Sequence, residues 1–289
     1  MTPDDLSRAL AHPGRASIPY LDRYSPDRPL VLECFRPHAH NPDKPVVIVQ
    51  HGMSRNGAEY CEAWVPAAER HGLLIVAITF SKEAWPDAVT YNNGHVLAED
   101  GSLRPRECWS QAIPGRVFAL LREAGVTRRG KTYLWGHSAG GQFVHRLLAT
   151  QPHGIFEAVG AANSGWYTLP TLDLPYPDGL GGIGLTGEDV VRLLGYPLVI
   201  FSGDQDIDGT AENFPRHEAA MAQGPNRFTR APFYLARGQA EAQSSACPAA
   251  GVASSCLVSR MRACGCRASP PIIGLVPLGA NSAGGAPCA

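Results

Sequence analysis

Apolar and polar positions along the chain follow two periods, one typical of buried strands and one typical of helices. The runs "PVVIVQ" at 45–50 and "LLIVAITF" at 73–80 are apolar and rich in β-branched residues, which predicts strands covered on both faces. Between them, the run at 59–71 suits a helix that stops at Gly72. Strand, helix and strand in this order predict one βαβ unit.

The alternation continues toward residue 203. A helix is predicted from near Pro114 to Gly125, because apolar residues recur at helical spacing between them. The runs "KTYLW", "IFEAVGAAN" and "YPLVIFSG" predict three more strands, and a further helix is expected from Ala139 onward. Together these elements predict an α/β fold with a mostly parallel central sheet and helices on both faces.

Two early runs are linked by a turn-forming stretch. "PLVLECF" at 29–35 is strand-like, and the letters NPDK separate it from the strand at 45–50. We expect these two strands to be neighbours in the sheet.

Composition limits the class of protein. The chain has 289 residues, 44% of them apolar, and a formal charge of −1 with scattered basic residues, so we expect one domain and no nucleic-acid partner. The first residues are polar and acidic, and no run reaches the roughly 18 apolar residues that span a bilayer. The chain is therefore expected to be cytoplasmic, with no membrane partner.

One serine lies between glycines where a strand pattern gives way to a helix pattern, in "YLWGHSAGGQFVHRLL". Gly136, Ser138 and Gly140 fit G-x-S-x-G, in which the glycines let strand and helix approach while the serine occupies a tight turn beside the helix N-terminus. Ser138 is therefore a candidate nucleophile. The alternative is a serine that only caps the helix.

A serine that attacks a carbonyl needs hydrogen-bond donors for the oxyanion that forms. One donor is expected to be the amide of Ala139, directly after the serine. The second is expected to be the amide of Met53, because "VVIVQHGMSRNG" places the preceding His51 and Gly52 at the end of a strand. The alternative is that His51 and Gly52 form an ordinary turn.

The segments "VIVQHGM", "GHSAGG" and "VIFSGDQD" occur in an order that resembles the α/β-hydrolase superfamily. The intervening "YNNGHVL" and "RPRECW" resemble the branch of polyhydroxybutyrate-depolymerase-like serine esterases, over about residues 29–230. In this family an acid in the turn after a late strand orients the catalytic histidine, commonly in a G-x-x-D pattern. Gly203 and Asp206 match that pattern, with Asp204 and Asp208 as competitors.

The family order then requires a histidine downstream, and none is found in the expected loop. The only histidine after Asp206 is His217, in "FPRHEAAMAQ", which suits a solvated helix better than a catalytic loop. His217 is therefore kept as a possible substitute base. His137 is expected to point away from Ser138, and His145 is expected to be structural.

The C-terminal 242–289 segment differs from the rest of the chain. It contains no Asp, Glu or Lys and is rich in Cys, Ala, Gly and Ser, so residues 1–241 are expected to form the domain and the last strand and helix are expected to be missing or aberrant. One interpretation is a low-complexity tail, and another is a shifted reading frame from near Ser244. Reading GC-rich codons for 245–262 two bases later permits a strand-like run followed by Pro-Gly-Val-Ala-His-Ala-Gly. A disulfide or zinc framework is not favoured, since paired C-x₂-C spacing is absent.

Two functions therefore stay open. The chain is a serine hydrolase that forms an acyl-enzyme on Ser138 with a small ester or acyl substrate, or it is an impaired or non-catalytic protein of the same fold. The insertion at 163–195 is expected to form a cap, in which Trp166 and Tyr167 either line an acyl pocket or only cover the core. No cofactor or metal is implied, because G-H-S-A-G lacks the spacing of a dinucleotide or phosphate-binding loop.

Overall fold

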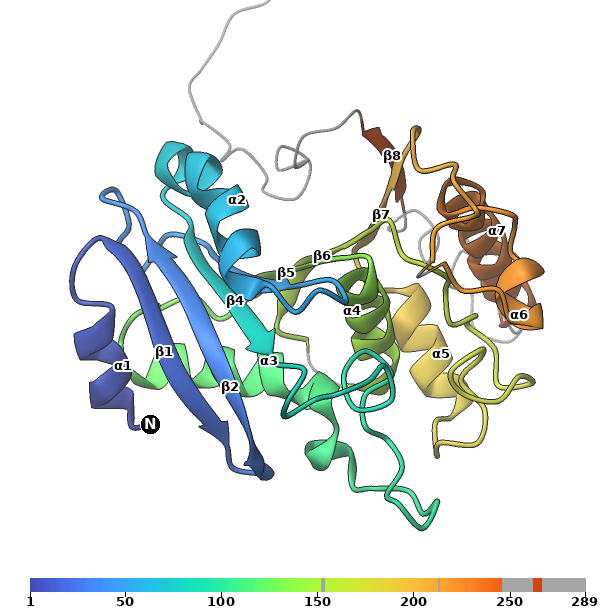
Figure 1. Cartoon of the computed structure of the whole chain (residues 1–289), viewed down its shortest axis with the longest axis horizontal. Helices are drawn as coiled ribbons and strands as arrows, with labels where there is room; N and C mark the ends of the chain where they lie inside the picture. Colours follow the sequence, from blue (N-terminus) through green and yellow to red (C-terminus); the bar gives the residue numbers. More distant parts are fainter. Residues whose placement is uncertain (152–153, 213, 246–261, 267–289) are drawn as a thin grey trace, which may run out of the picture.

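The structure is a computed structural model that describes residues 1–151, 154–212, 214–245 and 262–266 (Figure 1). In these residues the strands form one sheet in the order β1-β2-β4-β3-β5-β6-β7-β8. Strands β1, β2 and β4 pair antiparallel, and β4, β3, β5, β6, β7 and β8 pair in parallel. The strands are β1 Gly14–Asp22, β2 Ser25–Arg36, β3 Val46–Gln50, β4 Leu74–Phe80, β5 Thr132–His137, β6 Phe156–Ala162, β7 Leu198–Gly203 and β8 Arg262–Cys266.

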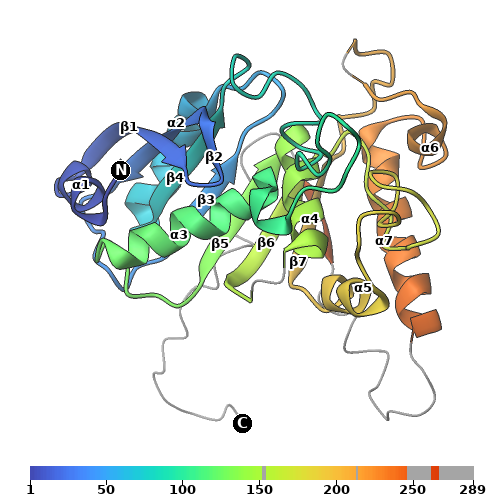
Figure 2. The ribbon, with the colours of Figure 1, turned by 90° about the horizontal axis from the view of Figure 1, so that it is seen from below.

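Helices cover both faces of this sheet, as predicted (Figures 1 and 2). Helix α2 lies on one face, over β2, β3 and β4, while α3, α4, α5 and α7 belong to the opposite layer. The described helices are α1 Pro3–Ala9, α2 Gly57–His71, α3 Ile113–Glu123, α4 Ala139–Thr150, α5 Gly187–Leu194, α6 Glu218–Met221 and α7 Arg227–Ser245, with short 3₁₀ turns η1 Arg106–Cys108 and η2 Ser110–Ala112. Gly72 ends α2 in the left-handed conformation, with φ 71°.

The core divides at the sheet, because successive side chains of a strand point to opposite faces. On β3, Ile48 packs into the large cluster with Phe143 of α4, whereas Val49 packs into the cluster beneath α2. In the second cluster the rings of Trp64 and Trp135 meet edge to face at 5.7 Å. Continuous apolar runs in β3 and β4 follow from this double burial.

The expected pairing of the strands at 29–35 and 45–50 is wrong. Strand β4 lies between β2 and β3, and Leu32 of β2 pairs with Ile78 of β4. The connection after β2 carries the chain past β4, so that β3 gains parallel neighbours on both sides. Strand β1, which forms a hairpin with β2, was not predicted from the sequence.

The C-terminal edge also differs from expectation. A strand is present, since β8 pairs in parallel with β7, although its sequence Arg-Ala-Cys-Gly-Cys is unlike a buried strand. The physical reason is that a sheet edge offers unpaired backbone donors and acceptors to any extended segment, whatever its side chains. Helix α7 continues to Ser245, past the expected boundary at 241. A helix after β8 would fall outside the described residues.

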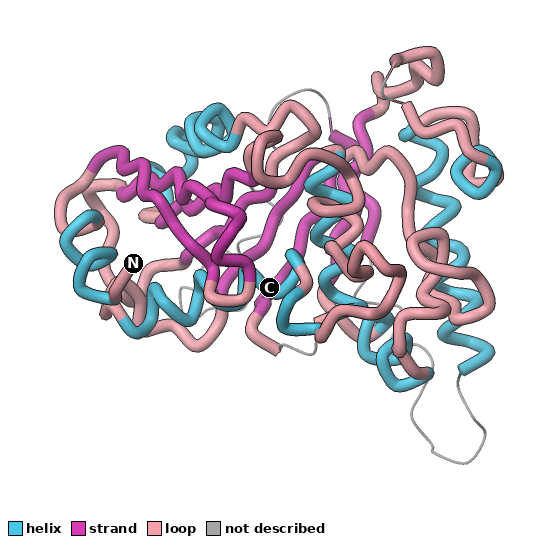
Figure 3. The backbone as a smooth tube through the Cα atoms, turned by 60° about the horizontal axis from the view of Figure 1, so that its bottom comes forward, coloured by secondary structure: helices cyan, strands magenta, loops and turns pink. Residues whose placement is uncertain are grey.

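Long loops gather on the half of the molecule that holds α4 to α7 (pink in Figure 3). The insertion predicted at 163–195 consists of an irregular segment followed by α5, which packs on α4 and α7 as part of the helical layer. The irregular part joins the earlier loop through a small cluster of Val96, Trp109 and Ile183. These loops surround the carboxyl ends of the parallel strands, where sites of α/β sheets form.

Candidate active site

The Ser138 turn, residues 136–141, links β5 directly to α4. Ser138 is the N-cap residue of α4 with φ 56° and ψ −116°, a backbone conformation that a non-glycine residue rarely adopts. Its amide donates to the Ala162 carbonyl at 2.9 Å, and its carbonyl accepts from the Gln142 amide at 3.0 Å. No side-chain capping bond is formed by Ser138, so its hydroxyl is not used as a helix cap.

The turn needs glycines because neighbouring segments approach its backbone too closely to leave room for a side chain. A Cβ added at Gly136 would collide with the Gly140 carbonyl, and one added at Gly140 would collide with the Gln50 carbonyl at the end of β3. A Cβ at Gly141 would lie 2.6 Å from the Ser164 hydroxyl. The turn is therefore wedged between β3 and the segment after β6.

The loop at 51–56 follows β3 and is oriented by His51. The His51 ring is fully buried, and its Nε2 accepts from the Phe80 amide at 2.9 Å. The remaining ring nitrogen, Nδ1, therefore carries the proton and donates to the Gly52 carbonyl at 2.8 Å. Because C=O and N–H point in opposite directions across a trans peptide, the Met53 amide is turned away from His51.

The 51–56 loop and the Ser138 turn lie side by side. A Cβ added at Gly52 would be 3.6 Å from Ser138 Cβ and 3.8 Å from the His137 carbonyl. The Ala139 amide is in the first turn of α4 and has no partner within that helix. The two predicted donors, the Met53 and Ala139 amides, thus belong to loops that meet at Ser138.

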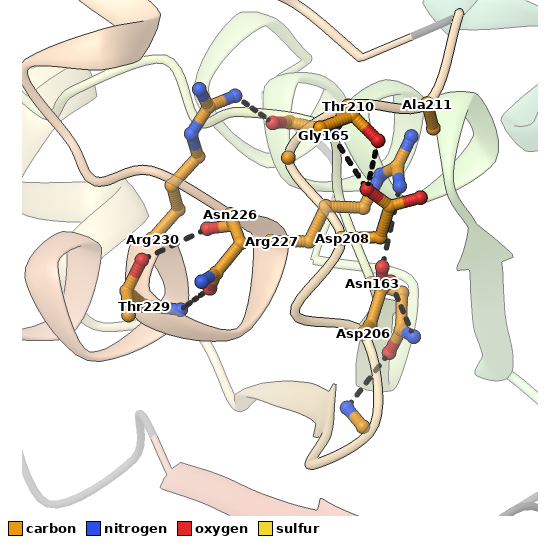
Figure 4. A network of polar contacts seen from close by, with 12 residues as sticks. Asn163, Gly165, Asp206, Asp208, Thr210, Ala211, Asn226, Arg227, Thr229 and Arg230 are labelled. Atoms are coloured by element: carbon orange, nitrogen blue, oxygen red, sulfur yellow. Dashed lines mark hydrogen bonds and ion pairs between the residues drawn. The ribbon is translucent and has the colours of Figure 1, made fainter.

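The Asp206 turn, residues 203–210, follows β7 and is organised by side chains (Figure 4). Asn163 Nδ2 donates to Asp206 Oδ2 at 2.9 Å, and Asn163 Oδ1 accepts from the Gly203 amide at 3.1 Å. Arg227, at the start of α7, forms an ion pair with Asp206 at 3.3 Å. The carboxylate of Asp206 thus faces the end of β6.

The competing carboxylates have other surroundings. Asp208 accepts from the Thr210 amide and hydroxyl at 2.7 and 2.6 Å, so it closes its own turn. Asp204 Oδ1 is buried without a partner in the described part of the chain. Of the three, Asp206 is the one tied to the neighbouring strand end through Asn163.

His217 does not lie with Asp206. Its Nε2 is 3.1 Å from Asp178 Oδ1, and its ring meets Trp166 edge to face at 4.8 Å. Among residues 1–151, 154–212 and 214–245, no histidine is hydrogen-bonded to Asp206 or to Ser138. The histidine that the family order requires further along is absent from the sequence, since residues 218–289 contain none.

Of the other histidines near the turn, His51 and His145 are buried and His137 is partly buried. Burial lowers the pKa of His51 to about 4 and that of His145 to about 3. Burial also lowers the pKa of His137, against the nearby Asp206 carboxylate, which raises it. His145 accepts from the Thr168 amide at 3.0 Å, in keeping with the structural role expected for it.

Trp166 and Tyr167 pack against α4. The Arg146 guanidinium lies over the Trp166 ring at 4.5 Å, and Tyr167 stacks on Tyr234 of α7 at 4.7 Å. Trp166 retains a 7% exposed edge, whereas Tyr167 has none. Substrate contact stays a prediction, and of the two only the Trp166 edge reaches solvent.

The described residues contain neither a metal-ligand cluster nor a membrane-spanning helix. No group of three or more His, Cys, Asp or Glu side chains is placed to hold a metal ion in the described ranges. Cys34, Cys61 and Cys108 are free thiols. Within the same ranges no helix is long and apolar enough to cross a bilayer.

Sequence reasoning missed several residues of this site. Asn163 holds Asp206 from the end of β6 with φ 45°, and the signal for it was an asparagine at a strand end, a residue that tolerates this conformation. Arg227 and Tyr60 could not be placed, because they reach the site from helices distant in sequence.

The order of strands, the two-sided helical cover and the strained strand–serine–helix turn define an α/β-hydrolase. No protein-family model and no curated protein sequence matches the chain. Solved structures do: the poly(3-hydroxybutyrate) depolymerase LpqC from Bordetella parapertussis is 46% identical, with 92% of this chain and 87% of that chain covered and a TM-score of 0.85.

Poly(aspartic acid) hydrolase-1 from Sphingomonas sp. KT-1 is 31% identical, with 88% of this chain and 91% of that chain covered and a TM-score of 0.80. At these identities and coverages the relationship extends beyond the fold. The chain belongs to the polyhydroxybutyrate-depolymerase-like esterase family of the α/β-hydrolases.

Proposed function

We propose that the chain is a serine hydrolase of carboxylic-ester-type substrates and that Ser138 forms the acyl-enzyme. The observation that carries this proposal is the strained Ser138 turn, whose serine makes no capping bond and lies next to Gly52 of the 51–56 loop. A non-glycine residue held at φ 56° is strained, and such a conformation persists only where the surrounding structure enforces it. Strained residues of this kind cluster at active sites.

The reaction follows from these positions. Ser138 Oγ attacks the ester carbonyl carbon, and the carbonyl oxygen gains negative charge that the Met53 and Ala139 amides stabilise. This mechanism needs a histidine to take the serine proton and return it to the leaving alcohol, and His217 is the only histidine after Asp206 in the chain. Water then releases the acid, with the same base taking the proton of the water and returning it to Ser138. Asp206 is proposed to orient that histidine, since its carboxylate is fixed by Asn163 at the end of β6.

The substrate is proposed to be a small ester or acyl compound. The two relatives are named for hydrolysis of poly(3-hydroxybutyrate) and poly(aspartic acid), so esters of hydroxy acids are the first substrates to test. The segment after β6 supplies Trp166 as a proposed contact. A cytoplasmic location, and the absence of nucleic-acid and membrane partners, stay predictions.

A second candidate function is an impaired or non-catalytic hydrolase fold. It is favoured by the surroundings of His217, which pairs with Asp178 and meets the Trp166 ring edge to face. As a substitute base, His217 would have to leave both partners. In this alternative the segment 242–289 is the product of a shifted reading frame and lacks the required histidine.

Labelling with a fluorophosphonate separates the two functions. An activated Ser138 should be labelled stoichiometrically within minutes to hours, as measured by intact mass and peptide mapping, and Ser138→Ala should abolish the label while the melting temperature is kept. The matched control is Ser102→Ala, which removes an exposed hydroxyl bound to Asp100. A label that persists in Ser138→Ala would eliminate Ser138 as the nucleophile.

A further inference from the structure

Tyr60 brings a hydroxyl to the junction of the 51–56 loop and the Ser138 turn. Tyr60 lies in the first turn of α2, which begins at Gly57 directly after the loop. A Cβ added at Gly52 would lie 3.1 Å from Tyr60 Oη and 3.6 Å from Ser138 Cβ. The phenol oxygen and the serine therefore flank the same glycine.

The hydroxyl is bonded to the residue that precedes the serine. Tyr60 Oη lies 2.7 Å from His137 Nδ1, and the His137 ring is nearly parallel to that of Trp135, at 10°. Burial raises the pKa of the Tyr60 hydroxyl. The phenol donates to His137 Nδ1 when that nitrogen carries no proton, and it accepts from Nδ1 in the other tautomer.

We infer that the Tyr60 hydroxyl is a positioning group that ties the 51–56 loop to the Ser138 turn and so fixes the spacing of the Met53 and Ala139 amides. This inference rests on the proposed function, because that spacing matters only if the amides receive an oxyanion. The loop follows β3 and the turn follows β5, and a hydroxyl anchored on a third element restrains both at once. Transition-state donors must be held to within about 0.5 Å to act.

Helix α2 is a firm base for such a tie. Trp64, one turn further along α2, packs edge to face on Trp135 of β5, so the helix and the strand that carries His137 cannot shift independently. The rings of Tyr60 and His137 are 6.0 Å apart and those of Tyr60 and Trp135 are 6.2 Å apart. Removing the Tyr60 oxygen would leave this aromatic packing in place.

Tyr60→Phe tests the inference on the full chain, with Tyr176→Phe as the matched control. Tyr176 Oη also joins two elements, donating to the Asn93 carbonyl at 2.8 Å and accepting from Gln111 at 3.1 Å, and it makes no contact with the Ser138 turn. The second-order rate constant for fluorophosphonate labelling of Ser138 should fall about 10- to 100-fold in Tyr60→Phe, less than the 10²–10³ lost with a direct oxyanion donor. It should stay within about twofold in Tyr176→Phe.

A second variant and the NMR spectrum of His137 distinguish loss of the Tyr60–His137 hydrogen bond from a general loss of rigidity. His137→Leu removes the same bond from the other side, so the double variant Tyr60→Phe/His137→Leu should label no more slowly than the slower single variant. The imidazole ¹⁵N signals of His137 should shift in Tyr60→Phe and stay unchanged in Tyr176→Phe. Fully additive losses, or unshifted His137 signals, would overturn the inference.

The outcomes also separate this inference from the proposed function. Labelling of Tyr60→Phe at the wild-type rate overturns the role of Tyr60 and leaves Ser138 as the nucleophile. If the unchanged chain is not labelled at Ser138, the proposed function fails. Amide hydrogen exchange then tests whether the Tyr60 hydroxyl restrains the 51–56 loop. Faster exchange of the amides at 52–53 in Tyr60→Phe alone supports it, and equal exchange in all three proteins overturns it.

Discussion

The Ser138 turn and the Asp206 turn leave the same edge of the sheet, at the ends of β5 and β7, and they are held by different forces. Steric exclusion fixes the Ser138 turn, because neighbouring backbone leaves no room for a side chain at Gly136 or at Gly140. Polar side chains fix the Asp206 turn, with Asn163 on one side and Arg227 on the other.

Because of this difference, the two turns should respond differently to substitutions, salt and pH. A backbone wedge is insensitive to salt and pH, and it fails abruptly when one carbon is added. A turn held by hydrogen bonds and an ion pair loses stability in steps of about 1 kcal/mol as partners are removed. The Ser138 turn can therefore keep its shape in a chain whose Asp206 has no histidine to orient.

The largest expected effect concerns that missing partner. The chain as printed should hydrolyse a short-chain p-nitrophenyl ester at near-background rates, because loss of a triad histidine costs on the order of 10⁶ in kcat in a related mechanism. A gene corrected by a single-base change near the codons for 244–262, so that the frame encodes a histidine, should restore turnover. Sequencing that stretch and assaying both proteins checks this, and ordinary enzymatic rates from the printed chain would contradict it.

Gly140→Ala should break the Ser138 turn. The added methyl would collide with the Gln50 carbonyl, and we expect a loss of about 3 kcal/mol in the free energy of unfolding, at the upper end for overpacking. Urea denaturation measures it. Gly187→Ala is the control, since its Cβ would meet open space at the start of α5, and it should change stability by less than about 0.5 kcal/mol. Equal effects in the two variants would show that the turn is not sterically wedged.

Asn163 offers a finer test of the Asp206 turn. Asn163→Ala removes hydrogen bonds to Asp206 and Gly203 and keeps an unfavourable φ of 45°, so a loss of about 3 kcal/mol is expected. Asn163→Gly removes the same bonds and relieves the φ, and it should be about 1 kcal/mol more stable than the alanine variant. If the two unfold at the same urea concentration, the backbone strain at Asn163 contributes nothing.

The smallest effect is expected at His217. Its side chain is 44% exposed and its pair with Asp178 is at the surface, so His217→Ala should cost less than about 1 kcal/mol and leave Ser138 labelling unchanged. His38→Ala, which breaks another exposed histidine–carboxylate pair, is the control. A collapse of labelling in His217→Ala alone would make His217 the base.

Sequence reasoning succeeded where the requirement is local. Ser138 and its glycines are adjacent letters whose spacing encodes a steric need, and the helix at 59–71 ends at a glycine that takes a left-handed φ. It failed where partners come from afar. The insertion of β4 between β2 and β3 depends on pairing across the sheet, and Tyr60 reaches His137 from 77 positions away.

The same limit explains β8. Pairing along β7 uses backbone groups that every residue carries, so a segment without an apolar pattern gives no signal for it. Asn163 lies between these cases, since its residue type suits a left-handed φ but its partners Asp206 and Gly203 lie some forty positions on.

The place of β8 at the edge of the sheet limits what a shifted reading frame can alter. Strands β1 to β7 all lie before residue 204, and β8 begins only at Arg262. Strand β8 pairs with β7 alone in the described sheet. Two strands, β6 and β7, separate β5 from β8. An altered reading frame in the last codons therefore changes an edge strand and leaves the strands beside the serine turn, β3 and β6, as encoded.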